Sequence, residues 1–244
     1  MTKSELLRDS VNVDTNTVSF NDPAQNRLFW MSTGQTMPDG KFSITSFEIF
    51  SLQFGYSPIK NLQLNFSTYV YPILFDENTY WSMGTKIQLL PPKRNFYGLS
   101  IGVDVGFIDK IGRISSSLEK SIHSLNIATS FGTERFLTHV SASQLQFLSK
   151  NRREVPIPTF IQIGTEISLK KTNEGKGSKL IAESFFTPND ERKISFSTFI
   201  VGFRFYSQST VAEIALPFST FGFFNSATTN PRFIFPWGSL TFIF

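Results

Sequence analysis

The chain of 244 residues contains no cysteine. This absence excludes disulfides, thiol chemistry and cysteine-rich zinc sites. The sequence also lacks any run near the roughly 18 consecutive apolar residues that a membrane helix needs. Yet hydrophobic residues make up 40% of the chain, with 28 Phe among them, and mean hydropathy is only −0.07. Many apolar residues without apolar runs indicate alternation of apolar and polar side chains, as in β-strands.

Residues that carry metal or cofactor chemistry are also scarce. The only two histidines, His123 and His139, have no carboxylates in register with them, so no metal site is predicted. No Gly-rich phosphate loop or nucleotide fingerprint occurs, and no cofactor is predicted. The net charge is +4, but basic residues gather in short turns, which favours solvated loops over a nucleic-acid surface.

Period-2 alternation is clearest in residues 62–72, where Leu62, Leu64 and Phe66 share one face and Gln63 and Asn65 the other. The same pattern, stronger or weaker, predicts twelve strands: 27–33, 42–57, 62–72, 79–90, 96–107, 123–132, 136–148, 157–169, 179–187, 194–206, 210–217 and 235–244. The clearest of these have about the length of a tilted membrane strand, roughly 9–11 residues.

The connections between these strands alternate in length. Four are tight, 57–61, 91–95, 133–135 and 207–209, and a longer but Gly-rich turn, 170–178, lies on the same side. The other side holds the two longest, 109–122 and 218–231, with shorter connections at 73–78, 150–155 and 188–193. Bacterial outer-membrane barrels have short periplasmic turns and longer outer loops. The sequence therefore predicts an all-β, antiparallel up-and-down transmembrane barrel over residues 27–244, preceded by a polar N-terminal extension, 1–26.

The last residues form an apolar strand that ends on an aromatic residue. Leu240, Phe242 and Phe244 lie on one face of it, an ending that barrel-assembly machinery reads in bacterial outer-membrane barrels. The predicted location is therefore the outer membrane, with membrane lipid and that machinery as partners. The first eight residues lack the apolar core of a signal peptide, so we expect the sequence to be a mature or recombinant form.

A soluble β-sandwich is the alternative fold. Its solvent face would carry many Lys and Glu, whereas here the less apolar face is sparse in charge and rich in small residues, including Gly84, Gly98, Gly102, Gly106, Gly164 and Gly202. A confined lumen tolerates such residues, and the opposite face is bulky enough for lipid. The pattern favours the membrane barrel.

Six charges fall on the polar phase of their strands: Lys86, Asp104, Glu166, Glu183, Arg204 and Glu213. Buried charges must pair or be hydrated. They indicate either a structural network that plugs the lumen or a narrow polar conduit or small-ligand site, since a twelve-stranded lumen lies between filled and open barrels. The expected role is structural or passive transport of small solutes, without enzymatic activity.

Two further functions stay open. His139 and Ser141 share a strand face and resemble the His-x-Ser pair that outer-membrane phospholipases carry on the lipid-facing wall. Catalysis would also need an orienting group and an oxyanion hole, and no Asn-Gly follows Ser141. Alternatively, the loops 109–122 and 218–231 bind a surface or envelope partner.

The segment 21–34, Asn-Asp-Pro-Ala-Gln-Asn-Arg-Leu-Phe-Trp-Met-Ser-Thr-Gly, resembles the opening of an uncharacterised family of bacterial outer-membrane barrels. That opening reads Asn-Pro-x-x-x-Arg-(Leu/Tyr)-Phe-Phe-x-x-Thr-Gly. Later segments, 184–186 and 201–205, are similar to its Glu-Asn-(Trp/Phe) and Gly-(Leu/Val)-Arg-Phe-Phe segments. The resemblance implies an outer-membrane barrel with an opening strand here, and assigns no activity or functional residue.

Overall fold

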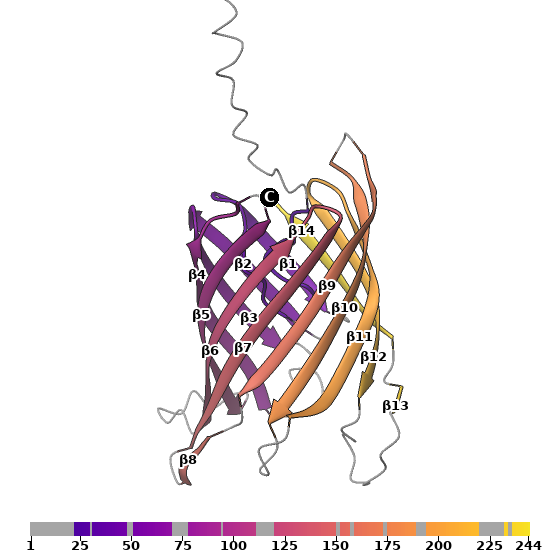
Figure 1. Ribbon diagram of the computed structural model, residues 1–244. Helices are drawn as coiled ribbons and strands as arrows, with labels where there is room; N and C mark the ends of the chain where they lie inside the picture. Colours follow the sequence, from indigo (N-terminus) through magenta and orange to yellow (C-terminus); the bar gives the residue numbers. More distant parts are fainter. Residues whose placement is uncertain are drawn as a thin grey trace, which may run out of the picture.

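Strands of alternating sequence pair with their neighbours and close into a ring in the computed structural model (Figure 1). The structure describes residues 22–29, 31–47, 51–69, 78–93, 95–110, 120–149, 152–156, 159–172, 175–188, 194–219, 232–233 and 236–244. Within them, twelve strands form the wall: β1 Phe42–Phe47, β2 Ser51–Ile59, β3 Leu62–Tyr69, β4 Asn78–Leu90, β5 Phe96–Lys110, β6 Lys120–Gly132, β7 Phe136–Ser149, β9 Phe160–Lys171, β10 Gly177–Pro188, β11 Ile194–Tyr206, β12 Thr210–Ser219 and β14 Trp237–Ile243. Two short strands, β8 (Arg152–Pro156) and β13 (Arg232–Phe233), pair with β7 and β12.

All pairings in the wall are antiparallel. β1 pairs with β2 on one side and β14 on the other, β14 pairs with β12, and β12 pairs with β11, which closes the ring. Closure leaves no strand edge with unpaired backbone groups, and a membrane-spanning sheet requires this because lipid offers no hydrogen bonds. The all-β, twelve-stranded antiparallel barrel expected from the sequence is confirmed.

The first two predicted strands are nevertheless wrong. The predicted number of wall strands is still twelve because one strand too many and one too few cancel. Residues 27–33 form no wall strand; Arg27 and Ser32 make only an isolated bridge. Residues 42–57 form two strands, β1 and β2, instead of one. Phe47 pairs with Ser51 across this hairpin, and because these positions are an even number apart, the period-2 pattern runs through it without a break.

The two ends of the barrel differ as the connection lengths predict. The connections β2–β3, β4–β5, β6–β7, β9–β10 and β11–β12 are short and lie at the end that holds the C-terminus, at the top of Figure 1. At the turn between β2 and β3, Asn61 has a φ of 70°, which Asn tolerates better than most residues. Strand β8 lies at the opposite, long-connection end. Most of the loops 109–122 and 218–231 fall outside the described residues.

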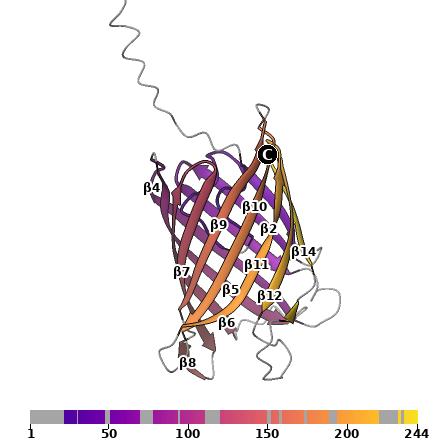
Figure 2. The ribbon, with the colours of Figure 1, turned by 45° about the vertical axis from the view of Figure 1, so that its right-hand side comes forward.

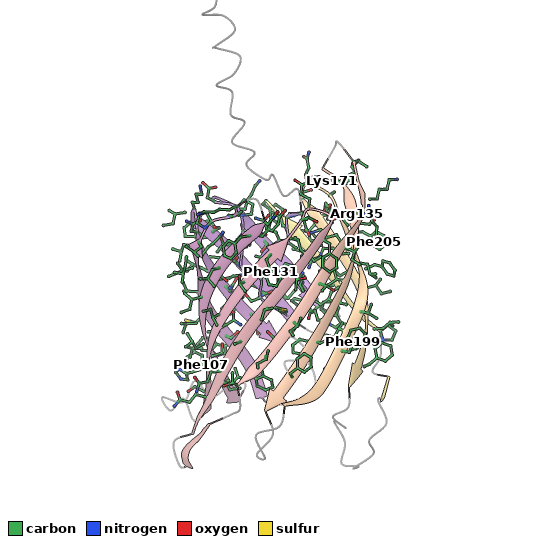
Figure 3. All side chains as sticks on the ribbon, in the orientation of Figure 1. Phe107, Phe131, Arg135, Lys171, Phe199 and Phe205 are labelled. Carbon is green, nitrogen blue, oxygen red and sulfur yellow. The ribbon has the colours of Figure 1, made fainter. Side chains whose placement is uncertain are left out.

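The outer face of the wall is apolar around the ring. Large hydrophobic side chains exposed on it include Leu64, Phe66, Met83, Ile87, Val103, Leu125, Ile127, Ile163, Ile167, Phe203, Ile214, Leu240 and Phe242. Figure 3 shows side chains covering the wall, with Phe131 and Phe205 toward the short-turn end and Phe107 and Phe199 toward the other. The cations Arg135 and Lys171 lie beyond them, at the short-turn rim.

Such an apolar belt with polar rims is the surface of a barrel embedded in lipid. Figure 2 shows the same wall of tilted strands from another side. The chain ends on this belt, where Phe244 is exposed and its ring lies 6.3 Å from that of Phe42 on β1. In the described part of the chain, no helix is long and apolar enough to cross a membrane.

Candidate functional site

The six charged residues singled out in the sequence all lie on the inward phase of the wall. Each comes from a different strand: Lys86 (β4), Asp104 (β5), Glu166 (β9), Glu183 (β10), Arg204 (β11) and Glu213 (β12). Arg204 and Glu183 are fully buried, whereas their outward neighbour Phe203 is 43% exposed. Charges taken so far from water need partners, and the chain's own N-terminal residues supply many of them.

Residues 22–29 and 31–37 occupy the lumen rather than the wall, and the segment 22–37 that they define is here called the plug segment. Leu28, Phe29, Met31 and Thr33 are at most 1% exposed. The segment is compact because it hydrogen-bonds to itself: the Leu28 N–H donates to the Met31 carbonyl at 2.9 Å, and the Thr33 hydroxyl donates to the Gln25 carbonyl at 2.6 Å. A segment folded back in this way fills part of the lumen.

Arg204 is the wall residue that contacts the plug segment most extensively. Its guanidinium donates to the Asp22 carboxylate at 3.1 Å and to the carbonyls of Ala24, Arg27 and Leu28 at 2.9–3.2 Å. On the wall side, its Nε donates to Glu213 at 2.8 Å. The five donors of a guanidinium suit it to such a hub.

Glu213 is a second junction between the wall and the plug segment. Besides Arg204, it accepts a hydrogen bond from Arg27 of the plug at 2.9 Å and one from the hydroxyl of Ser239 on β14. Arg27 also donates to Thr241 at 3.1 Å. Strands β11, β12 and β14 are thereby tied to the same turn of the plug.

A chain of polar contacts continues from Asp22 around the lumen. The Lys179 ammonium donates to Asp22 at 2.6 Å and also to Glu166, and Glu166 lies 3.2 Å from His139 Nε2. Burial alone would raise the pKa of the Asp22 carboxyl, but the nearby Lys179 and Arg204 cations outweigh it and hold the pKa below its ordinary value. Asp22 is therefore ionised at neutral pH.

The wall also holds the plug through its backbone. Ser100 donates to the Thr33 carbonyl at 2.9 Å, and Lys86 donates to the Asn26 carbonyl at 2.8 Å. Other wall side chains accept N–H groups of the plug: Glu183 from Phe29, Ser130 from Gly34, Gln88 from Thr36 and Gln63 from Met37. Backbone groups buried in the lumen thus find partners, and the contacts come from most sides of the ring.

An apolar cluster packs the same region. Its buried members are Leu28, Phe29, Met31, Ile181, Ile200, Ala215 and Trp237. The rings of Phe29 and Trp237 meet edge to face with centroids 5.5 Å apart, a favourable aromatic geometry. The apolar residues Leu28, Phe29 and Met31 of the predicted strand 27–33 are therefore explained by burial inside the barrel.

Glycine is required where the plug touches the wall most closely. A Cβ at Gly34 would lie 2.1 Å from the Gly98 carbonyl oxygen, and Gly98 itself has a φ of 131°. A Cβ at Gly164 would lie 2.2 Å from Leu28. Gly98 and Gly164, two of the small residues noted on the less apolar face of the wall, therefore make room for the plug segment.

The two residues considered as a catalytic pair also face the lumen, not lipid. Ser141 donates to Gln162 at 2.6 Å, and His139 Nδ1 lies 2.7 Å from the Ser130 hydroxyl. His139 and Ser141 thus engage different partners, unlike a nucleophile and its base. The pair that they resemble in outer-membrane phospholipases lies on the lipid-facing wall, whereas His139 and Ser141 are buried on the inward face of β7.

His123 lies on the outward phase of β6, apart from His139, and its Nε2 is 3.1 Å from the Ser121 hydroxyl. Among the described residues, no group of three or more His, Asp or Glu side chains could hold a metal ion. The lumen chemistry is therefore that of ion pairs and hydrogen bonds.

The described residues enclose at least two hollows beside the plug segment. One has room for only about 10 Å³ and lies between Arg27 and the inner face of β1–β3. The other is about 390 Å³ and is lined by wall residues including Lys86, Asp104 and Asn126, with Ser32 of the plug. The described lumen is therefore closed near its short-turn half and hollow toward its long-connection half.

Closed wall, apolar belt and polar interior define a transmembrane β-barrel of the outer-membrane type. No protein-family model matches the sequence. No curated protein matches it either.

Solved structures of outer-membrane barrels resemble the chain distantly. A bacterial polysaccharide outer membrane secretin matches with a TM-score of 0.46 and 12% identity, over 80% of this chain and 69% of that one. The translocator domain of the autotransporter NalP from Neisseria meningitidis matches at 0.35 and 9%, over 83% of each chain. OmpT, an outer membrane protein of Vibrio cholerae, matches in its trimer form at 0.36 and 8%, over 79% of this chain and 63% of that one. Similarities this low say nothing about what this chain binds or transports.

Three residues of the site, Asp22, Arg27 and Lys179, were not predicted from the sequence. Asp22 was placed in a polar extension, and Arg27 was assigned to an opening strand. Lys179 stood at the edge of its predicted strand and was not selected, although it shares the inward phase of Glu183. The sequence feature that could have indicated the plug is the segment from Asp22 to Gly34. It combines turn residues, the charges of Asp22 and Arg27, and apolar side chains.

Proposed function

We propose that the protein is an outer-membrane barrel that its plug segment keeps closed, and that small polar solutes pass only when this segment moves. The observation that carries the proposal is the binding of residues 22–37 across the lumen by side chains from most sides of the wall. The hollow toward the long-connection end offers an entry for solutes, and the plug is the barrier beyond it.

The ion pairs within the wall are consistent with a plug segment that can move out of the lumen. Arg204 pairs with Glu213, and Lys179 with Glu166, within the wall itself. Removing the plug would therefore leave these cations and carboxylates paired, in a lumen that water could then hydrate. An uncompensated buried charge would cost much more.

Planar-bilayer conductance tests this function. The wild-type barrel should be closed for most of the recording, whereas Gly34→Val should show frequent steps. Any side chain at position 34 meets the Gly98 carbonyl, so this change unseats the plug without altering the wall. Pro38→Ala, at an exposed position just past the plug, is the matched control and should stay closed.

Equal and steady conductance of wild type and Gly34→Val would contradict the proposal. A closed Gly34→Val barrel would contradict it too, provided that its gel mobility still differs between unboiled and boiled samples. That mobility shift shows that the barrel has folded. A second variant, which lacks residues 22–37, gives the open-lumen reference.

We also propose that assembly machinery recognises the terminal strand. β14 presents Leu240, Phe242 and Phe244 on its outer face, and Phe244 is 65% exposed. Phe244→Ser should lower the amount of folded barrel in the outer membrane without changing refolding of the purified chain into detergent. A defect confined to refolding in detergent would show that Phe244 acts in stability instead.

A further inference from the structure

We propose that the hollow of about 390 Å³ between the plug and the long-connection end, here called the vestibule, binds a neutral sugar of one or two rings. Its volume falls in the range of small-molecule sites, roughly 300–1,000 Å³. It is lined by Ser32, Asn65, Thr85, Lys86, Gly102, Asp104, Ser124, Asn126, Ser143, Leu145, Phe160, Gln162 and Phe185. Because binding there needs no movement of the plug, this inference goes beyond the gated passage proposed above.

Three carboxamides in the vestibule are each fixed by one neighbour. Asn126 Nδ2 donates to Ser143 at 2.6 Å, and Gln162 Oε1 accepts from Ser141 at 2.6 Å. Asn65 Oδ1 likewise accepts a hydrogen bond, at 2.7 Å. These contacts decide which way each amide points and leave its other polar atom without a hydrogen-bond partner among the described residues.

The three remaining atoms are one acceptor, Asn126 Oδ1, and two donors, Gln162 Nε2 and Asn65 Nδ2. Hydroxyl groups both donate and accept hydrogen bonds, so a polyhydroxylated ligand can satisfy all three atoms. A ligand that only accepts hydrogen bonds, such as sulfate, would leave the Asn126 carbonyl unmatched. Pre-oriented amides also lower the entropy cost of binding.

The charges of the vestibule favour a neutral ligand. Its lining holds one cation, Lys86, and one carboxylate, Asp104. Lys86 already donates to the Asn26 carbonyl at 2.8 Å, and Ser124 donates to Asp104 at 3.3 Å. Because the two charges are equal and opposite, the vestibule attracts neither anions nor cations overall.

One side of the vestibule is apolar. Leu145, Phe160 and Phe185 come from three successive wall strands, β7, β9 and β10. An apolar surface beside polar amides suits a ring that has C–H groups on one side and hydroxyls at its edge. An apolar lining with a few placed polar groups is typical of small-molecule sites.

Isothermal titration calorimetry on the full chain in detergent tests the inference, with glucose and maltose as ligands and glycine and inorganic phosphate as comparisons. The blocking variant is Gly102→Leu. A Cβ at Gly102 would be 3.5 Å or more from its neighbours, so the side chain extends into the vestibule without disturbing the wall. The matched control is Gly238→Leu on the outward phase of β14, where the nearest atom to a Cβ is also at 3.5 Å.

We expect saturable binding of at least one sugar, weakened about tenfold or more by Gly102→Leu and unchanged by Gly238→Leu. Asn126→Ala should weaken it about fivefold, as expected for one lost hydrogen bond. Absence of sugar binding, or binding that Gly102→Leu leaves intact in a folded barrel, would overturn the inference. Tighter binding of glycine or phosphate would overturn the ligand class. Sugar binding by a closed wild-type barrel supports the sugar site whatever the conductance of the Gly34→Val barrel. The sugar site and the gated passage can therefore be refuted independently.

Discussion

Replacing Arg204 by Met should loosen the plug more than any other single change in the wall. The substitution removes the donors to Asp22, Glu213 and three plug carbonyls. Breaking a buried ion pair by removing one partner costs about 3–5 kcal/mol. Asp22 keeps Lys179, and Glu213 keeps Arg27, so we expect the lower end, about 3 kcal/mol.

If this cost falls on the plugged state, the population with an open plug rises about 100-fold, since each 1.4 kcal/mol is a factor of ten. The native chain has no cysteine, so a single Thr33→Cys provides a thiol in the plug whose maleimide labelling rate reports opening. Thr33 is fully buried. Labelling in the Arg204→Met background should be faster by about that factor.

Two companion variants separate charge from geometry. Arg204→Lys retains the charge but not the planar fork of donors, so its labelling rate should lie between those of the parent and Arg204→Met. Adding Glu213→Gln to Arg204→Met removes the carboxylate that has lost Arg204 as a partner, so the double change should cost less than the sum of the two single changes. Equal labelling of the parent and Arg204→Met would refute the role of Arg204 as the hub.

Three other predictions follow from the wall, the core and the plug. Val103→Arg, near the middle of β5, should cost about 2–4 kcal/mol of barrel stability in lipid vesicles, against about 0–1 for Leu169→Arg near the short-turn rim; equal costs in urea titrations would contradict a membrane belt. Phe29→Ala should cost about 3 kcal/mol and change the fluorescence of Trp237, and an unchanged spectrum would place Phe29 elsewhere. Because its folded-state pKa is lowered, the Asp22 carboxylate stabilises the plug above its ordinary pKa of 3.8, and this contribution is lost as pH falls through the lower folded value. Asp22→Asn should therefore weaken acid-induced labelling of the Thr33→Cys thiol, whereas an identical acid profile would mean that other carboxylates control the plug.

The wall could be predicted from sequence because its chemistry repeats every two residues. Lipid outside and polar groups inside place Leu64 and Gln63 on opposite faces, and the same rule holds along most strands. The alternation of connection lengths then predicted that the wall begins and ends at its short-turn end, where Phe244 lies. The pattern does not show where a strand ends, however. Because the paired residues Phe47 and Ser51 are an even number of positions apart, the alternation continues across the hairpin, and the sequence predicted a single strand there.

The plug could not be predicted because its contacts join residues far apart in the chain. Arg204 meets Asp22 across 182 positions, and no local period records such a pairing. Phe29 and Met31 alternate like strand residues although they pack inside the lumen. The family resemblance of residues 21–34 implied the right fold but the wrong element, an opening strand, and the family itself stays a prediction.

Thiol accessibility in the wild-type background tests the central claim, that residues 22–37 close the lumen. The probes are Thr33→Cys, buried in the plug, and Asp39→Cys, exposed just beyond it. In the folded barrel, the Asp39→Cys thiol should label readily and the Thr33→Cys thiol should be protected, with the difference abolished by boiling in detergent. Equal labelling of the two thiols in the folded barrel would show that the segment does not occupy the lumen.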